Sequence, residues 1–450
     1  MSEFDGAFGD KRRSAVLAAL EDAMVAQSSV VVRRLGEDRA GEISAHRALS
    51  APEVTPAGIV DCLARRTAAA VAGRRIVVVQ DTSEVNFAGR RRGRGLGPAG
   101  RTGATPGFYI HAAVAVDAED EAVLGLVDAV IWTREGKETT DRRQRSLEDK
   151  EAYRWLAVTQ ATSERLSGAR ERIVVGDREN DIYAVFARRP QDTHLVVRSG
   201  QNRKLADNHR LFDAAQAWPV LGCRLVKVPS RGPGDAGRVA RVELRAGVVE
   251  LRQPRHGKRE GDVPTLAVSL VEAVEIGAPP GIKPLHWRLL TTLPVDDLAA
   301  AMDIVQLYRL RWRIEQSFRM LKSDGLKLEE AQTLDPHRLF NLSALAMSAA
   351  VRIIQLVDAR DGSNRPASDV ASAPEIAAAA ALCPKLEGKT ARQRNPHPMN
   401  GLAWLSWIVA RLGGWNCYYK PPGPKTMRQG WDRFAAIAEG FALANPAANP

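Results

Sequence analysis

The sequence is poor in cysteine and lacks long apolar runs. Its four cysteines, Cys62, Cys223, Cys383 and Cys417, are scattered without a C-x-x-C pair, which argues against a structural zinc site and against a disulfide framework. No charged segment followed by an apolar one opens the chain, and no apolar run approaches the length of a membrane span. We therefore expect a soluble protein of the reducing cytoplasm, with no membrane partner.

Acidic residues and aromatic residues are also in short supply. Lys and Arg number 64 against 53 Asp and Glu, for a net charge of +11; this balance favours a polyanionic partner. Aromatic residues make up 6% of the chain, which leaves few for the sugar cleft of a glycoside hydrolase that uses paired carboxylates. At 450 residues we expect two or more domains, or one domain with a large insertion.

Three regions differ in sequence pattern. Residues 1–72 look helical and basic, and Arg12 and Arg13 near a helix start are candidate contacts to DNA phosphates, or else solvated surface arginines. Residues 73–360 combine β-branched runs with helical segments, which predicts a mixed α/β core. A run of strands at about 193–294 is predicted to be inserted into that core. Residues 361–450 look helical again.

The most informative segment is YRLRWRIEQSFRMLK, residues 308–322. As a single helix at about 100° per residue, it places Tyr308, Arg311, Glu315 and Lys322 within an arc of about 60°. A carboxylate, two cations and a phenol then border the predicted core, where a charge needs a partner or a metal. This arrangement favours a metal-bound carboxylate beside groups that bind phosphate. The adjoining, core-facing arc holds Leu307, Leu310, Ile314, Phe318 and Leu321.

Two more carboxylates are predicted at the ends of strands, Asp81 after IVVVQ and Asp177 after RIVVG. Together with Glu315 they would form an all-oxygen site suited to Mg²⁺, for which Mn²⁺ can substitute. Two such ions roughly 3.5–4 Å apart activate an attacking oxygen and stabilise a leaving oxygen at phosphorus. Each residue also has an ordinary alternative: a strand-end Asp often caps a turn, and a helical Glu beside arginines often forms an exposed ion pair.

With these features the sequence resembles the DDE cut-and-paste transposases of the insertion-sequence-four type. The spacing Y-x2-R-x3-E-x6-K at 308–322 is specific to that group. The resemblance runs over most of the chain, but the Gly/Arg-rich loop at 89–107 differs from the family, so DNA contacts there are not transferable. The N-terminal region matches at only a few positions, and the Ala-rich stretch near 366–382 carries no recognisable match. The other matching segments are GDKRR at 9–13, QDTSEVNF at 80–87, KEAYRW at 150–155, GDRENDI at 176–182, VVRSG at 196–200, PLHWRLLTTLPV at 284–295 and VARLGGW at 409–415.

The resemblance implies a ribonuclease H-like catalytic core, interrupted by a β-rich insertion, in which Asp81, Asp177 and Glu315 bind two metal ions and catalyse the reaction. The implied activity is excision and insertion of a mobile element through DNA hydrolysis, hairpin formation and strand transfer. The partners would be double-stranded DNA at the transposon ends, target DNA and a second copy of the chain, with the C-terminal helices and their tryptophans supplying dimer contacts. We would then expect association with the nucleoid.

The resemblance also implies roles for residues around the carboxylates. Tyr308, Arg311 and Lys322 would hold phosphates at the cleaved strand end. Trp287, twenty-one residues before Tyr308, would stack on a flipped base while the hairpin forms; taken alone, a Trp in an apolar strand would be a core residue. Arg198, within VVRSG, is a further candidate DNA contact.

Two other functions remain open. One is a ribonuclease H-like nuclease that cuts without strand transfer, against which the Tyr–Arg–Glu–Lys spacing and Trp287 argue. The other is a non-catalytic DNA-binding protein derived from a transposase, against which the three intact carboxylates argue.

Overall fold

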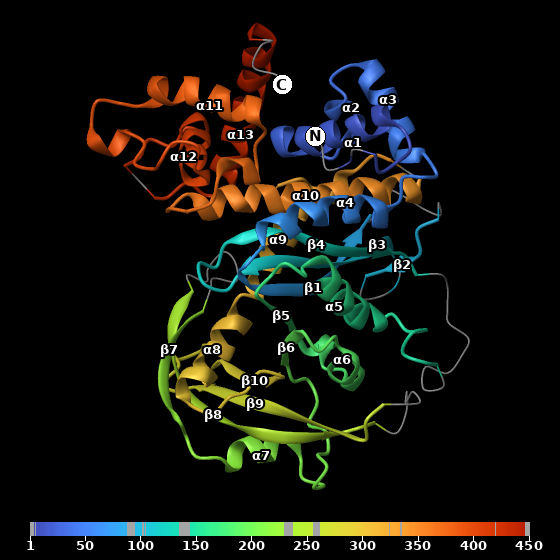
Figure 1. The fold of residues 1–450 in the computed structure, drawn as a ribbon, viewed down its shortest axis with the longest axis vertical. Helices are drawn as coiled ribbons and strands as arrows, with labels where there is room; N and C mark the ends of the chain where they lie inside the picture. Colours follow the sequence, from blue (N-terminus) through green and yellow to red (C-terminus); the bar gives the residue numbers. More distant parts are fainter. Residues whose placement is uncertain are drawn as a thin grey trace.

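The structure is a computed structural model of the whole chain. It describes residue 4 and residues 6–87, 95–100, 103, 105–134, 145–228, 237–254, 262–323, 325–333, 335–418 and 420–445. One long sheet forms the centre of the molecule, and helices lie along both of its faces and above it (Figure 1). The mixed α/β class predicted from the sequence is confirmed.

The first part of the sheet combines antiparallel and parallel strands. β1 pairs antiparallel with β3, and β3 pairs antiparallel with β4 and with the short β2. On its other side, β1 lies parallel to β5, and β5 lies parallel to β6. The order across the sheet is therefore β4–β3–β1–β5–β6. These strands are β1 (Arg75–Asn86), β2 (Pro98–Ala99), β3 (Thr105–Asp117), β4 (Val123–Trp132), β5 (Glu171–Gly176) and β6 (Thr193–Arg198).

The β-rich block continues the same sheet. β10 pairs antiparallel with β6, and the order runs on through β9 and β8 to β7. Because β6 is parallel to β5, it belongs with the parallel strands although the sequence pattern grouped it with the block at 193–294. The remaining strands are β7 (Gly222–Val228), β8 (Arg238–Arg252), β9 (Thr265–Glu275) and β10 (His286–Thr291).

Two cores form because successive strand residues point to opposite faces. In β1, Val77 and Val79 join the larger core beneath α9 and α10, whereas Ile76 and Val78 join a second core with α5 and α6. The helices are α1 (Lys11–Gln27), α2 (Val32–Leu35), α3 (Arg39–Ser50), α4 (Pro56–Ala70), α5 (Tyr153–Arg165), α6 (Tyr183–Arg188), α7 (Leu211–Ala217), α8 (Leu298–Arg309), α9 (Trp312–Lys322), α10 (Pro336–Ala359), α11 (Ala373–Leu386), α12 (Leu402–Leu412) and α13 (Pro424–Ala444), with 3₁₀ turns η1 (Arg178–Asn180), η2 (Leu328–Glu330), η3 (Ala367–Asp369) and η4 (Ala391–Gln393).

The helices of the two chain ends share one layer, separated from the sheet by α4 and α10 (Figure 1). Trp404 and Trp407 of α12 are buried in the larger core, whereas Trp415 is only partly buried against it. The first two fit an ordinary helix core, and the proposed dimer contacts stay a prediction. Contrary to the sequence-based expectation, one helix in the described part of the chain, α10, is long and apolar enough to cross a membrane. However, 89% of its most apolar window is buried inside the protein, as in a core helix.

A buried ion cluster ties this layer together. Glu21 of α1, only 2% exposed, accepts hydrogen bonds from the Arg66 guanidinium at 3.0 Å and from the Ser348 hydroxyl at 2.7 Å. Arg352 of α10 lies 3.8 Å from Glu21 and 2.6 Å from Asp22. Burial alone would raise the pKa of Glu21, but the two arginines outweigh it and hold that pKa below its usual range. The cluster therefore holds α1 and α4 onto α10 as charged groups.

We predict that Arg352→Met lowers the free energy of unfolding by roughly 3 kcal/mol, because removing one partner leaves a buried charge poorly compensated. Denaturant unfolding at pH 7 measures this loss. The matched control is Arg360→Met, which breaks the more exposed Arg360–Asp361 pair at 3.2 Å and should cost at most about 1 kcal/mol. Equal losses in the two variants would contradict a special role for the buried cluster.

Candidate functional site

The parallel pairing of β1 with β5 brings Asp81 and Asp177 together. Val79 of β1 lies opposite Val175 of β5, and each aspartate is two residues further along its own chain, so the two carboxylates lie at matching positions on one face. Asp177 follows β5 directly, as the sequence predicts, and its carboxylate accepts the Glu179 N–H at 2.8 Å. It therefore also caps η1.

The prediction that Asp81 ends its strand is wrong. β1 continues to Asn86, because beyond the end of β5 it keeps pairing with β3, as far as the pair Asn86↔Gly107. Asp81 therefore sits within a long strand at the point where its parallel neighbour stops. This makes its backbone a firmer support than a strand end would be.

The single helix predicted over 308–322 is also wrong in one respect. α8 ends at Arg309 and α9 begins at Trp312. Between them the Arg313 N–H bonds to the Leu310 carbonyl at 2.9 Å and the Ile314 N–H to the Arg311 carbonyl at 3.2 Å, the three-residue spacing of a tighter 3₁₀ turn. The core-facing arc is confirmed, since all five of its members are buried: Leu307, Leu310, Ile314, Phe318 and Leu321.

Arg311 joins the third carboxylate to the first. One guanidinium nitrogen, Nη1, lies 3.0 Å from Asp81 Oδ2, and the other, Nη2, donates to Glu315 Oε1. All three side chains are partly buried. Glu315 on α9 and Asp81 on β1 are thereby brought to the same guanidinium, which lies between the two carboxylates; their role as metal ligands stays a prediction.

The three carboxylates act on one another electrostatically. Burial raises the pKa of Asp81, the Arg311 guanidinium partly offsets this, and the negative charges of Asp177 and Glu315 raise it again, to about 6. Asp81 therefore carries an unfavourable charge at neutral pH even with its arginine partner. A further cation at this position would relieve that cost.

The three carboxylates have the donor atoms that a divalent cation needs, although they are not arranged as a preformed metal site. Within the described residues, no group of three Asp, Glu, His or Cys side chains stands ready to hold a metal ion, and between Asp81 and Glu315 the Arg311 guanidinium occupies the intervening position. The donors are all carboxylate oxygens, the ligands that Mg²⁺ and Mn²⁺ prefer. Asp81, Asp177 and Glu315 are the residues that would hold such an ion.

Tyr308, Trp287 and Arg198 form a second group beside Arg311. The rings of Trp287 and Tyr308 meet edge to face, with centroids 5.0 Å apart and planes at 72°. Burial raises the pKa of the Tyr308 hydroxyl, while Arg311 and Arg198 oppose it, Arg198 also by a hydrogen bond. Trp287 is half-buried against the larger core, so its packing satisfies the core alternative and leaves part of its ring accessible.

Lys322, the last residue of α9, contacts β1 beyond Asp81. Its ammonium donates to the Glu84 carbonyl at 2.6 Å and lies 3.4 Å from the Glu329 carboxylate. Glu84 is three residues beyond Asp81, so this cation borders the same strand without reaching the carboxylates themselves.

The structure does not bring the two N-terminal arginines to this site. Arg12 is exposed on α1, in the helical layer above the sheet (Figure 1). Arg13 donates to the Phe8 carbonyl at 2.9 Å and to the Glu53 carboxylate at 3.0 Å, which are contacts among the N-terminal helices. Their predicted role in DNA binding stays a prediction.

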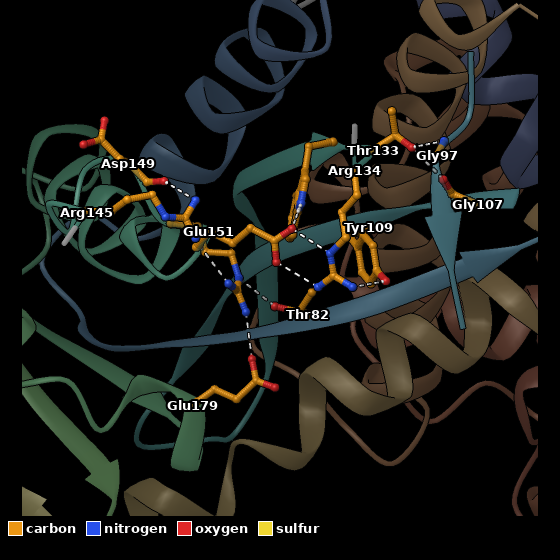
Figure 2. A network of polar contacts seen from close by, with 12 residues as sticks. Thr82, Gly97, Gly107, Tyr109, Thr133, Arg134, Arg145, Asp149, Glu151 and Glu179 are labelled. Carbon is orange, nitrogen blue, oxygen red and sulfur yellow. Dashed lines mark hydrogen bonds and ion pairs between the residues drawn. The ribbon is translucent and has the colours of Figure 1, made fainter. Parts of the chain in front are cut away.

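Sequence reasoning missed Arg154 of α5. Its Nε donates to the Thr82 hydroxyl at 3.1 Å and its Nη2 to the Glu179 carboxylate at 2.7 Å, so it touches the segments that carry Asp81 and Asp177. Figure 2 shows Thr82 and Glu179 within this polar network. Helical periodicity could not reveal it, because its partners lie 72 and 25 residues away; the match of KEAYRW was the available signal.

We predict that Asp81→Asn stabilises the metal-free protein by roughly 1–3 kcal/mol at pH 7–8. Folding raises the pKa of Asp81 from 3.8 to about 6, so ionisation of this group costs stability as the pH rises through that window. The gain should vanish below about pH 4, where the carboxyl is protonated in both states. Thermal unfolding against pH in EDTA measures it, with the exposed Asp432→Asn of α13 as control. A gain independent of pH would contradict the assignment.

Comparison with known families supplies independent information. Residues 129–351 match the family model described as the transposase DDE domain. The match runs from β4 into α10, so it contains Asp177 and Glu315, whereas Asp81 lies before it. This match supports a transposase of the DDE family, an enzyme that acts on DNA in recombination.

Proposed function

We propose that this chain is a cut-and-paste transposase of the insertion-sequence-four type, with a ribonuclease H-like core. The observation that carries the proposal is the placement of three acidic residues: Asp81 lies in β1, Asp177 lies at the matching position directly after the parallel strand β5, and Glu315 is joined to Asp81 through Arg311. The strand order β4–β3–β1–β5–β6, with three antiparallel strands followed by two parallel to β1, supports the core assignment.

Asp81, Asp177 and Glu315 would hold the metal in this proposal. When bound, two Mg²⁺ ions, or Mn²⁺, supply positive charge at phosphorus and lower the pKa of attacking water. Arg311 then needs a new anionic partner in place of the carboxylates, and a DNA phosphate is the chemically matched choice for its planar fork of donors. The guanidinium would thus exchange intramolecular carboxylates for the strand end.

The surrounding residues would bind and orient DNA. Tyr308 and Arg198, beside Arg311, and Lys322, which contacts β1 beyond Asp81, carry hydrogen-bond donors suited to phosphate oxygens. Trp287 offers the accessible part of its ring for stacking with an extruded base. The net charge of +11 supports attraction of the polyanion over longer distances. Arg12 and Arg13 would contribute from the N-terminal helices, which we assign to recognition of transposon ends.

Each chemical step in this proposal is an in-line displacement at phosphorus. Water nicks one strand at the transposon end and frees a 3′-OH. That hydroxyl attacks the opposite strand, which leaves a hairpin and releases the flanking DNA. A second water opens the hairpin, and the 3′-OH finally attacks target DNA. We propose that a homodimer acts on the paired ends, in the cytoplasm at the nucleoid.

A nuclease without strand transfer is the second candidate, and one observation favours it. Tyr308 is 4% exposed and Trp287 packs against it in the core. In the free protein, packing alone therefore explains the positions of both rings, without a role in stacking on a DNA base.

Incubation of pre-cut transposon ends with target plasmid separates the two functions: joined products establish strand transfer, whereas hydrolysis alone identifies a nuclease. Binding without cleavage would favour a non-catalytic descendant.

We predict that the wild-type protein with Mg²⁺ cleaves DNA carrying the flanking ends of its own gene. Glu315→Ala should lower cleavage by at least about a thousandfold, because a lost metal ligand removes charge stabilisation at phosphorus. DNA binding by this variant should persist. Gel analysis of end-labelled DNA measures nicked, hairpinned and fully cut ends. Glu439→Ala, an exposed position of α13, is the control and should cleave normally. Undiminished cleavage by Glu315→Ala would overturn the site assignment.

A further inference from the structure

The face of β1 opposite the carboxylates carries an ordered polar chain. Gln80 and Thr82, the neighbours of Asp81, point to the α5 side of the sheet because strand residues alternate. The Thr82 hydroxyl lies 2.9 Å from His111 Nδ1, His111 Nε2 lies 3.0 Å from Gln80 Oε1, and the Gln80 amide donates to Thr159 at 3.3 Å. Both sequence neighbours of Asp81 are therefore held.

The direction of the hydrogen bonds in this chain follows from its last acceptor. The Thr159 hydroxyl gives its proton to the Trp155 carbonyl and accepts from the Gln80 amide nitrogen, so Gln80 Oε1 faces His111 and accepts from the Nε2–H. Neutral His111 then has an unprotonated Nδ1, which accepts from the Thr82 hydroxyl, and the Thr82 oxygen in turn accepts from Arg154 Nε at 3.1 Å. Complete burial holds the pKa of His111 well below its usual range, which keeps it in this neutral form.

The chain begins and ends on α5. After Gln80, the Thr159 hydroxyl donates to the Trp155 carbonyl at 2.8 Å, and Trp155 is the residue that follows Arg154. Its aromatic ring also packs edge-on against the His111 ring, with centroids 4.5 Å apart. Helix α5 is thus fastened across β1 and β3 directly behind Asp81.

Arg154 extends the same fastening to the second aspartate. Its Nη2 donates to Glu179 at 2.7 Å, and the Glu179 N–H is the group that the Asp177 carboxylate accepts at 2.8 Å. One guanidinium therefore spans the residue after Asp81 and the residue two positions after Asp177. Figure 2 shows Thr82 and Glu179 at this junction, with Glu151 near by.

The exposure of its partner indicates that Arg154 contributes more to the position of these segments than to the stability of the fold. The Arg154 side chain is 12% exposed, but Glu179 is 62% exposed, and a pair with one exposed member contributes little to folding. Nη1 also donates to the Glu151 carbonyl at 2.8 Å, and the guanidinium lies over the rings of Trp132 and Trp155, 5.4 Å from each centroid. Its orientation is therefore fixed from several sides.

We propose that Arg154 is a positioning residue that fixes the separation of Asp81 and Asp177 by tying Thr82 to Glu179 from behind the sheet. This inference rests on the proposed function, since it concerns how the two aspartates are presented to a metal ion. Partners that orient metal ligands from outside typically change metal affinity by about 10–100-fold when removed. Lysine cannot replace Arg154, because one ammonium cannot donate in the fixed fork that reaches both partners.

The test measures Mn²⁺ affinity of the full-length protein bound to its DNA ends, by electron paramagnetic resonance of free Mn²⁺, together with DNA affinity and thermal unfolding. We expect Arg154→Lys and Thr82→Val each to weaken Mn²⁺ binding about tenfold, with unchanged DNA binding. Thr82→Ser keeps the hydroxyl and should restore wild-type affinity. The double variant should lose no more than either single variant, because both break one linkage.

The matched control is Arg188→Lys. Arg188 of α6 makes a comparable fork, with Nε at 2.8 Å and Nη2 at 2.6 Å from the Asp262 carboxylate, but it touches neither aspartate segment. Wild-type Mn²⁺ affinity in Arg154→Lys would overturn the inference, as would equal losses in Arg188→Lys or in Thr82→Ser. If Asp81→Asn binds Mn²⁺ as tightly as the wild type, and the wild-type protein cuts no DNA, then the proposed function is wrong. This inference, which rests on it, is then wrong as well.

Discussion

The pairing of β1 with β5 is the constraint on which the site depends. Because the two strands are parallel and Val79 lies opposite Val175, the chain places Asp81 and Asp177 at matching positions. A shift of one residue would turn one aspartate to the other face. The two hydrophobic cores oppose such a shift, since Val77 and Val79 are buried on one face and Ile76 and Val78 on the other. Apolar packing on both faces of β1 therefore sets the geometry of the carboxylates.

The charges of the site compensate one another only in part. Asp81 is raised in pKa by burial and by its two acidic neighbours, and Arg311 offsets only part of that cost. In the free protein, Arg311 bridges Asp81 and Glu315 and so compensates part of their negative charge. The same bridge explains why the described residues show no preformed metal cage although the donors are of the right kind. Cation and polyanion can therefore replace intramolecular pairs as they bind.

The sequence predicted some levels of this structure well and others poorly. The α/β class and the buried arc from Leu307 to Leu321 followed from periodicity, because burial repeats with the helical turn. The continuation of β1 past Asp81 and the turn between α8 and α9 did not, because strand pairing and local 3₁₀ geometry depend on distant partners. For the same reason Arg311 was placed on the correct stripe while its bridge to Asp81, and all of the Arg154 linkage, became visible only in three dimensions.

The central claim is that Asp81, Asp177 and Glu315 together ligate a divalent metal ion. Diffraction from crystals of the protein with its DNA ends and Mn²⁺, recorded at the manganese absorption edge, tests it most directly. We expect anomalous density in contact with carboxylate oxygens of all three residues, with the Arg311 guanidinium moved from between Asp81 and Glu315 onto a phosphate. Anomalous density elsewhere, with the Arg311 bridge intact in a complex that cleaves DNA, would contradict it.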